Sequence, residues 1–215
     1  MMTTVLSLGF ARIRRRIQKH HFNEEHHVDF FGERLIVTVT HTPSVIRRWI
    51  YSIRFFSRRS SHPLVVGLGV QWTPGGSYPP PDTLQLGVGI RCLIIQLSHC
   101  KRMPNVLRSF LEDETITFVG VWNSQDKDKL ERSHHQLDIW RLVDIRNYLP
   151  RWLWKCTFER IVEECLEHQG VKKDKEICRS NWGARSLSDD QIVQAYDVFV
   201  CCKLGVKERV WKMRA

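Results

Sequence analysis

The stretch LVVGLGVQW, residues 64–72, predicts a buried β-strand, because a short run rich in Val and Leu ends in a Trp and a Pro-Gly loop follows. Two glycines, Gly67 and Gly69, interrupt this run. Glycine weakens a strand interior, offers no side chain that packs or reacts, and often marks the close approach of another segment to the backbone. The strand therefore raises the question of which side chain Gly69 replaces.

The segments on either side of this strand indicate an α/β domain. A Gly-containing turn within alternating residues predicts a hairpin over residues 28–41. TLQLGVGI and CLIIQLS predict two strands whose short connections favour antiparallel pairing with residues 64–72. TITFVGVW, residues 115–122, predicts a fourth strand, and IWRLVDI a short strand or a helix start. The expected fold class is therefore α/β, a mixed sheet of three antiparallel strands and then alternating helices and strands, flanked by helices.

Helix signals occur between and after these strands. Thr42 and Pro43 match the N-cap and first position of a helix, and PNVLRSFLEDE and SQDKDKLERSHH predict two more. Ser188 and Gln191 form a capping box, S-x-x-Q, that opens the last helix, DDQIVQAYDVFVCCKL. Gly205 is expected to close this helix as a C-cap.

Length and composition indicate one soluble domain. The 215 residues suffice to bury a core without disulfides or metals. Apolar residues make up 42% and charged residues 26%, and Arg91 interrupts the longest apolar run, so no membrane span is expected. The seven cysteines are odd in number and lack C-x-x-C spacing, which favours a reducing compartment over a disulfide framework or a zinc site.

We expect residues 1–27 to form a basic, disordered arm and residues 28–215 to form the domain. Residues 1–23 contain five basic residues and no acid, which also resembles an organellar transit peptide. The cluster HHFNEEHH, residues 20–27, offers histidines and carboxylates. Without a rigid element to fix ligand geometry, it is expected to be a solvated tail rather than a metal site.

The charge distribution points to a polyanionic partner. The formal net charge is +10, and no acid occurs between Arg34 and Pro81. Neutralising phosphates releases condensed counterions, so such a surface favours nucleic acid. The best candidates for phosphate contact lie on the end and outer face of the first helix: Arg47, Arg48, Arg54, Arg58 and Arg59. A merely solvated helix face is the ordinary alternative. Trp72 and Trp122 are candidates to stack bases, although tryptophans at strand ends more often pack.

Five segments of the chain match one known family in order and spacing. Each segment alone would be weak evidence, but the combination is specific. The segments are LVVGLGVQW, LQLGVGIRCLIIQL, ITFVGVWNSQDKDKL, LVDIR and SNWGARSLSDDQIVQAYDVFVCCKLG. In their order and spacing the chain resembles the Werner-type 3'-5' exonuclease domain, a DEDD-type nuclease of the ribonuclease-H-like superfamily, over about residues 28–205. The resemblance implies a ribonuclease-H-like sheet. It also implies a two-metal mechanism in which four carboxylates hold two Mg²⁺ or Mn²⁺ ions.

The first family motif is a strand that carries D-x-E, and alternation places both acids on one face of the sheet, within reach of the metals. The corresponding positions here are Gly69 and Gln71, so the resemblance implies an aspartate where Gly69 stands and a glutamate where Gln71 stands. The second motif supplies an acid soon after the fourth strand, and Asp126 matches it. As an isolated observation, Asp126 would be explained by the dipole of a helix start.

The third motif is Y-x-x-x-D on the last helix, where the acid is a metal ligand and the tyrosine orients the attacking water. Asp197 matches the acid, but Val193 stands where the tyrosine is expected. Tyr196 lies about 100° around the helix from Asp197, on the wrong face to act with it. The stretch looks one residue shorter than the family pattern, and a distorted turn would partly restore the geometry.

The missing acids decide the expected activity. Two dications about 4 Å apart repel by roughly 15 kcal/mol at an effective dielectric near 20, and carboxylates must offset that repulsion. Only Asp126 and Asp197 remain as metal ligands, and Gln71 can lend no more than a neutral carbonyl. We therefore expect at most one weakly held metal and little or no turnover.

Three interpretations follow from the sequence. The leading one is a nucleic-acid-binding member of the exonuclease family that is catalytically impaired. The alternatives are an active 3'-5' exonuclease on DNA or RNA and a protein-interaction module that keeps only the scaffold. Nucleus or cytoplasm fits the resemblance best, the basic arm leaves an organellar address open, and the oligomeric state stays open as well.

Overall fold

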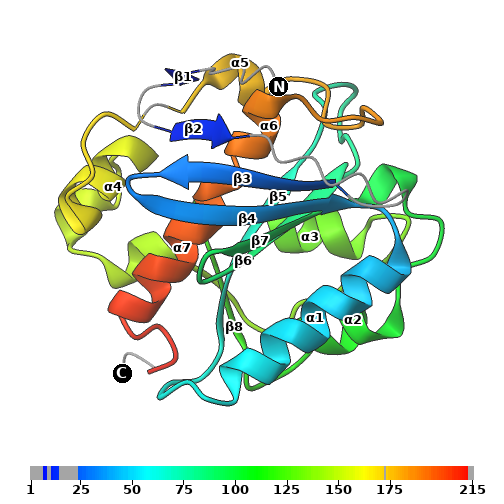
Figure 1. Cartoon of the computed structure of the whole chain (residues 1–215), viewed down its shortest axis with the longest axis horizontal. Helices are drawn as coiled ribbons and strands as arrows, with labels where there is room; N and C mark the ends of the chain where they lie inside the picture. Colours follow the sequence, from blue (N-terminus) through cyan, green and yellow to red (C-terminus); the bar gives the residue numbers. More distant parts are fainter. Residues whose placement is uncertain (1–6, 9–10, 15–23, 172, 213–215) are drawn as a thin grey trace.

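The computed structural model describes residues 7–8, 11–14, 24–171 and 173–212. Within these ranges, nine strands form one mixed sheet in the order β1-β2-β3-β4-β7-β6-β5-β8-β9 (Figure 1). The strands are β1 (Ser7–Leu8), β2 (Ala11–Arg14), β3 (Glu24–Phe30), β4 (Glu33–Thr40), β5 (Val65–Gln71), β6 (Thr83–Val88), β7 (Arg91–Gln96), β8 (Thr117–Gly120) and β9 (Leu142–Asp144). The helices are α1 (Pro43–Ser57), α2 (Asn105–Leu111), α3 (Asp126–Glu131), α4 (Phe158–Leu166), α5 (Lys175–Cys178), α6 (Asp189–Val193) and α7 (Tyr196–Lys207). The expected α/β fold class is confirmed.

The centre of the sheet is the antiparallel group that the short connections predicted. β5 pairs with β6, and β6 pairs with β7, both in antiparallel orientation. β4 joins β7 in parallel, while β8 and β9 extend the other edge in parallel. The hairpin of β3 and β4 is also confirmed, and its first strand begins at Glu24.

Helices cover the two faces of the sheet separately. On one face, the apolar sides of α1 and α2 pack in a cluster with Leu68 of β5. On the other face, Val198 of α7 belongs to a second cluster, together with α4 and α6. Figure 1 shows α1 and α7 on opposite sides of β6 and β7. Because side chains alternate along a strand, Gly67, Gly69 and Gln71 face α7 rather than α1.

The glycines of β5 differ in how closely α7 approaches them. A Cβ built on Gly67 would lie 1.7 Å from the backbone oxygen of Val198, so only glycine fits there. Its β6 partner Gly87 is also crowded, since a Cβ there would lie 2.9 Å from the same oxygen. At Gly69 a Cβ would lie 3.4 Å from Val198 Cγ1, which is an ordinary contact. Close packing therefore explains Gly67 but not Gly69.

The last helical segment differs from the sequence prediction in two respects. The capping box that opens it is confirmed, but the helix is interrupted after Val193, so α6 and α7 are separate. The prediction that Gly205 closes the helix is wrong, because α7 continues to Lys207. Gly205 instead lets α7 lie close to the sheet, since a Cβ there would lie 2.8 Å from Val65 Cγ1 and 2.9 Å from Val119 Cγ2.

The expected N-terminal arm, residues 1–27, falls largely outside the described residues. Where it is described, the backbone of β2 pairs with β3. Residues 24–27 lie within β3, and His26 is buried, so the expectation of a solvated tail is wrong for this half of HHFNEEHH. In the described part of the chain, no helix is long and apolar enough to cross a membrane.

Candidate functional site

A cleft of about 410 Å³ lies between β5, α7 and the start of α3. Its lining includes all four positions that the family motifs single out, namely Gly69, Gln71, Asp126 and Asp197. These residues come from three separate elements of the chain. The fold thus brings together the positions that the sequence analysis identified.

One wall of the cleft is formed by β5 and β6. Gly69 and Gln71 lie on the same face of β5, and Gln85 of β6 lies opposite Gly69 in the antiparallel register. Gln85 is 1% exposed, and its Nε2 has no hydrogen-bond partner among the described residues. The wall therefore presents two carboxamides and a bare backbone where the family pattern has two carboxylates.

Asp197, in the first turn of α7, forms an ion pair inside the cleft. Lys173 Nζ, from the connection between α4 and α5, lies 2.6 Å from Asp197 Oδ2. The two side chains are 25% and 11% exposed, respectively. Burial acts to lower the pKa of Lys173, but the Asp197 carboxylate outweighs it and leaves that pKa raised. Lys173 is therefore charged, and one oxygen of Asp197 is occupied by its ammonium group.

Asp126 is the first residue of α3 and is almost fully buried. Burial raises the pKa of its carboxyl group to about 7, although Lys173 opposes this rise. Its position at a helix start agrees with the dipole explanation, and its place in the lining agrees with the site explanation. The carboxyl group thus lies in the cleft in an environment that disfavours its charge.

The fold does not bring a tyrosine to the place beside Asp197 where the third family motif has one. Tyr196 stacks on Phe30, with ring centroids 5.0 Å apart and ring planes 7° apart. Val193 is buried in the same core cluster. Neither Tyr196 nor Val193 is among the described residues that line the cleft. The interruption between α6 and α7 therefore does not place a tyrosine beside Asp197 on the cleft side.

The five arginines predicted to contact phosphate lie on α1 or directly after it, on the sheet face away from the cleft. Arg54 donates to Asp113 Oδ2 at 3.0 Å, and the other four are exposed: Arg47, Arg48, Arg58 and Arg59. None of the five belongs to the described cleft lining. They form a basic surface that is separate from the candidate site.

The two tryptophans predicted to stack bases do line the cleft, but they differ in accessibility. The Lys129 ammonium lies 4.3 Å from the centroid of the Trp72 ring and 4.2 Å from that of Tyr78, so Trp72 takes part in internal packing. Trp122 is 42% exposed, with the Arg146 guanidinium 5.1 Å from its ring centroid. Only Trp122 therefore keeps substantial open ring surface at the cleft.

The sequence analysis missed Lys173, Gln85 and Arg179, which also line the cleft. Lys173 belongs to GVKKDKE, a charged stretch that is typical of a solvated connection, and nothing in it points to Asp197. Gln85 could have been found, because antiparallel pairing of residues 64–72 with TLQLGVGI places one of its polar residues beside Gly69.

The cleft does not fit a pair of metal ions. In the part of the chain that the structure describes, no group of three or more His, Cys, Asp or Glu side chains is placed to hold a metal. Asp197 Oδ1 is buried without a partner among those residues and is one unused acceptor. However, Asp197 Oδ2 faces Lys173, Gly69 has no ligand atom in a side chain, and Gln71 is neutral. Two Mg²⁺ or Mn²⁺ ions need more anionic ligands than this set supplies.

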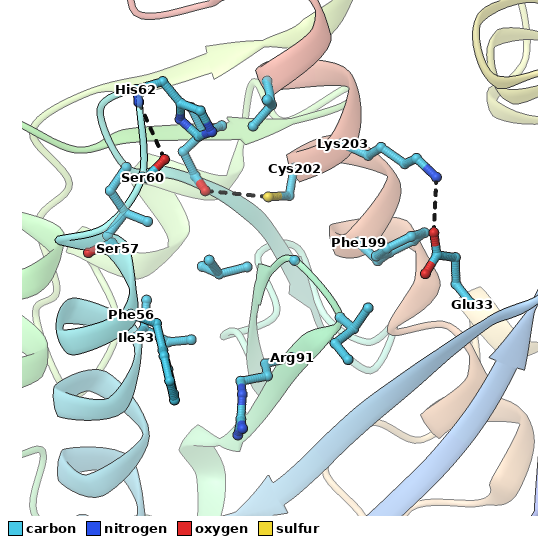
Figure 2. Close-up of a pocket in the computed structure, with 16 residues that line it drawn as sticks. Glu33, Ile53, Phe56, Ser57, Ser60, His62, Arg91, Phe199, Cys202 and Lys203 are labelled. Carbon is cyan, nitrogen blue, oxygen red and sulfur yellow. Dashed lines mark hydrogen bonds and ion pairs between the residues drawn. The ribbon is translucent and has the colours of Figure 1, made fainter.

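A second cavity of about 540 Å³ lies beside the start of β5 and the C-terminal half of α7 (Figure 2). Its lining is mainly apolar and includes Ile53, Val65, Val88, Phe199, Cys202 and Val206. Figure 2 shows Lys203 and Glu33 paired at its rim, with Lys203 Nζ 3.6 Å from Glu33 Oε1. None of the motif positions lines this apolar cavity, so the cleft is the candidate functional site.

A family model described as 3'-5' exonuclease matches residues 82–204. The chain belongs to the 3'-5' exonuclease family. This match begins after β5, so Gly69 and Gln71 lie outside the matched residues. The resemblance to the Werner-type exonuclease domain is confirmed by the relatives described next.

Two curated relatives and one solved structure illustrate the family. The exonuclease 3'-5' domain-containing protein 2 of Drosophila melanogaster is 30% identical over 136 residues, covering 60% of this chain and 22% of that protein. The bifunctional 3'-5' exonuclease/ATP-dependent helicase WRN of Mus musculus is 30% identical over 145 residues, covering 65% and 10%. Escherichia coli RNase D has a TM-score of 0.62 at 21% identity, covering 80% of this chain and 45% of that one. The chain spans less than a quarter of the length of either curated relative.

Proposed function

We propose that this protein binds nucleic acid in the cleft of a 3'-5' exonuclease fold and has little or no hydrolytic activity of its own. One observation carries the proposal: Gly69 and Gln71 occupy the β5 wall of a cleft whose other motif positions are Asp126 and Asp197. The two-metal chemistry of the family depends on four acids at these positions. A cleft with half of them cannot offset the repulsion between two dications.

Three features support nucleic acid as the partner. The formal net charge of +10 favours a polyanion. Lys173 and Arg179 place positive charge in the cleft lining. Trp122, which is half-exposed at the cleft, offers a ring on which a base can stack.

The alternative of an active exonuclease rests on the meeting of Asp126 and Asp197 in one cleft. A labelled 3'-recessed duplex incubated with the protein and Mg²⁺ or Mn²⁺ tests it, and we expect no shortening above background. The matched variants are Asp126→Asn and Asp128→Asn, because Asp128 is a neighbouring acid that pairs with Arg132 instead. Shortening that disappears in Asp126→Asn and Asp197→Asn but persists in Asp128→Asn would establish an active enzyme.

A binding measurement distinguishes the protein-interaction module from the proposed nucleic-acid-binding function. Anisotropy of a labelled single strand and a labelled duplex is recorded over a series of salt concentrations. Phosphate contacts predict a steep loss of affinity as salt rises, because each contact releases condensed counterions. Failure to bind either nucleic acid at low salt would leave only the interaction module.

A further inference from the structure

The cleft wall carries hydrogen-bond donors at the place where the family motif has acids. Carboxylates only accept hydrogen bonds, whereas a carboxamide carries an NH₂ group with two donors. Gln71 stands at one motif position, and Gln85 lies opposite the other. The Nε2 of Gln85 is buried and has no acceptor among the described residues. A buried donor without an acceptor points to a ligand or a water molecule at that place.

Lys173 is held in the cleft by contacts from two helices. Its backbone N–H donates to Glu159 Oε1 of α4 at 2.9 Å, and its ammonium lies 5.3 Å from the centroid of the Phe158 ring. Asp197 of α7 accepts one of its three N–H groups at 2.6 Å. The side chain is 25% exposed, so the remaining N–H groups can reach a ligand in the cleft.

These groups change the charge of the ligand that the cleft can accept, from a metal cation to a phosphate anion. Four unpaired carboxylates repel a phosphate unless metal ions lie between them. Here Asp126 and Asp197 share the lining with the cations Lys173 and Arg179 and with the neutral Gln71. A phosphate oxygen can therefore accept hydrogen bonds directly from the protein.

We infer that the Lys173 ammonium is a built-in cation that takes over the charge role of a metal ion, so that the cleft binds a phosphate of a nucleic-acid strand without any metal. Lys173 and the Gln85 amide donate to the phosphate oxygens, and Asp197 positions Lys173. This inference rests on the proposed function, since it explains how a family member that lacks two of the four metal-binding acids still holds a strand.

The test measures binding of a 5'-fluorescein-labelled single-stranded DNA octamer to the full chain by anisotropy, in EDTA and in Mg²⁺. We expect the octamer to bind in EDTA at least as tightly as in Mg²⁺, because no metal takes part and Mg²⁺ competes with the protein for the phosphates. Lys173→Gln should weaken binding about tenfold, the effect of one charge-assisted hydrogen bond. The matched control is Lys203→Gln, which removes the same charge from the exposed pair with Glu33 at the apolar cavity. We expect it to change the affinity by less than about twofold.

A second variant separates binding from folding. Lys173→Gln leaves Asp197 enclosed without its partner, which can destabilise the protein. The double variant Lys173→Gln with Asp197→Asn removes both charges and keeps the side-chain sizes similar. We expect it to melt near the parent temperature and still to show the affinity loss of about tenfold.

The outcomes distinguish the inference from the proposed function. Octamer binding that requires Mg²⁺, or that falls equally in Lys173→Gln and Lys203→Gln, overturns the inference and leaves the proposed function intact. Octamer binding that persists unchanged in the double variant also overturns it. No binding at low salt in either buffer overturns the proposed function itself.

Discussion

The cleft and the apolar cavity both use β5 and α7, yet each holds its ion pair in a different way. In the cleft, Lys173 and Asp197 are 2.6 Å apart, with side chains 25% and 11% exposed. At the rim of the apolar cavity, Lys203 and Glu33 are 3.6 Å apart, with side chains 40% and 45% exposed. An exposed pair contributes little, because water and salt screen both charges. An enclosed pair leaves a costly buried charge if either partner is removed.

This difference indicates that the charge of Lys173 belongs to the cleft rather than to a solvated surface. The apolar cavity shows that the same strand and helix also contribute to a lining that is mainly apolar. The cleft instead keeps carboxylates, carboxamides and a lysine in its lining. The lining of the cleft is therefore polar, although two of its motif positions, Gly69 and Gln71, carry no acid.

The largest expected effect is on stability. It tests the difference between the enclosed pair of Lys173 with Asp197 and the exposed pair of Lys203 with Glu33. Lys173→Met should lower the free energy of unfolding by about 3–5 kcal/mol, since it strands the Asp197 carboxylate. Lys203→Met should lower it by about 0–1 kcal/mol. Urea unfolding measures both. Equal losses would show that the two pairs are equivalent, and the addition of Asp197→Asn to Lys173→Met should recover much of the loss.

The next effect concerns the two glycines of β5. Gly67→Ala should destabilise the protein by about 3 kcal/mol, because the new Cβ would lie 1.7 Å from the Val198 oxygen. Gly69→Ala should cost less than about 1 kcal/mol, since its Cβ would meet only Val198 Cγ1 at 3.4 Å. Thermal unfolding distinguishes the variants. A large loss in Gly69→Ala would mean that packing, and not the loss of a functional acid, explains this glycine.

A smaller effect is expected from restoring the metal ligands. The variant Gly69→Asp, Gln71→Glu, Lys173→Ala should bind Mn²⁺, which at one hundred times its dissociation constant would stabilise the fold by about 2.7 kcal/mol. The control is the double variant that keeps Lys173, in which the ammonium still occupies Asp197 Oδ2. We expect little Mn²⁺-dependent shift in its melting temperature. Equal Mn²⁺ binding by both variants would contradict the role assigned to Lys173.

The smallest effect is expected at the apolar cavity. Phe56 lies at its rim and is 54% exposed, so Phe56→Ser should change stability by less than about 0.5 kcal/mol. Affinity for the DNA octamer should stay at the parent value, because Phe56 does not line the cleft. An affinity loss as large as that of Lys173→Gln would place the nucleic acid on the α1 face instead.

Much of the fold could be predicted because its signals are local. The apolar runs of residues 64–72 and of TLQLGVGI became β5 and β6, and Pro43 opened α1 as expected. The interruption between α6 and α7 was not predictable from periodicity, because the apolar spacing continues across it. Gly205 was assigned to a cap by its position near the helix end, whereas its contact with Val65 and Val119 depends on how α7 meets the sheet.

The residues of the candidate site also divide into those that the sequence predicted correctly and those that it did not. Gly69, Gln71, Asp126 and Asp197 follow from motif order, and the structure places them in one cleft. The phosphate-contact arginines were selected by charge alone, which does not say which sheet face a helix covers. Their helix α1 packs on the face away from the cleft, and this depends on contacts between distant segments.

The sequence by itself determined the order of the strands β3 to β8 and of the helices α1 to α3, the family motifs and the absence of acids at Gly69 and Gln71, because these are properties of residues near one another in the chain. Only the tertiary structure decided that Lys173 meets Asp197 and that Gln85 lies beside Gly69. The physical reason is that the local sequence around a charged residue in a polar connection does not indicate which distant residue it will pair with. Lys173 pairs with Asp197 because the packing of α4 and α7 brings the two side chains together and excludes water around them.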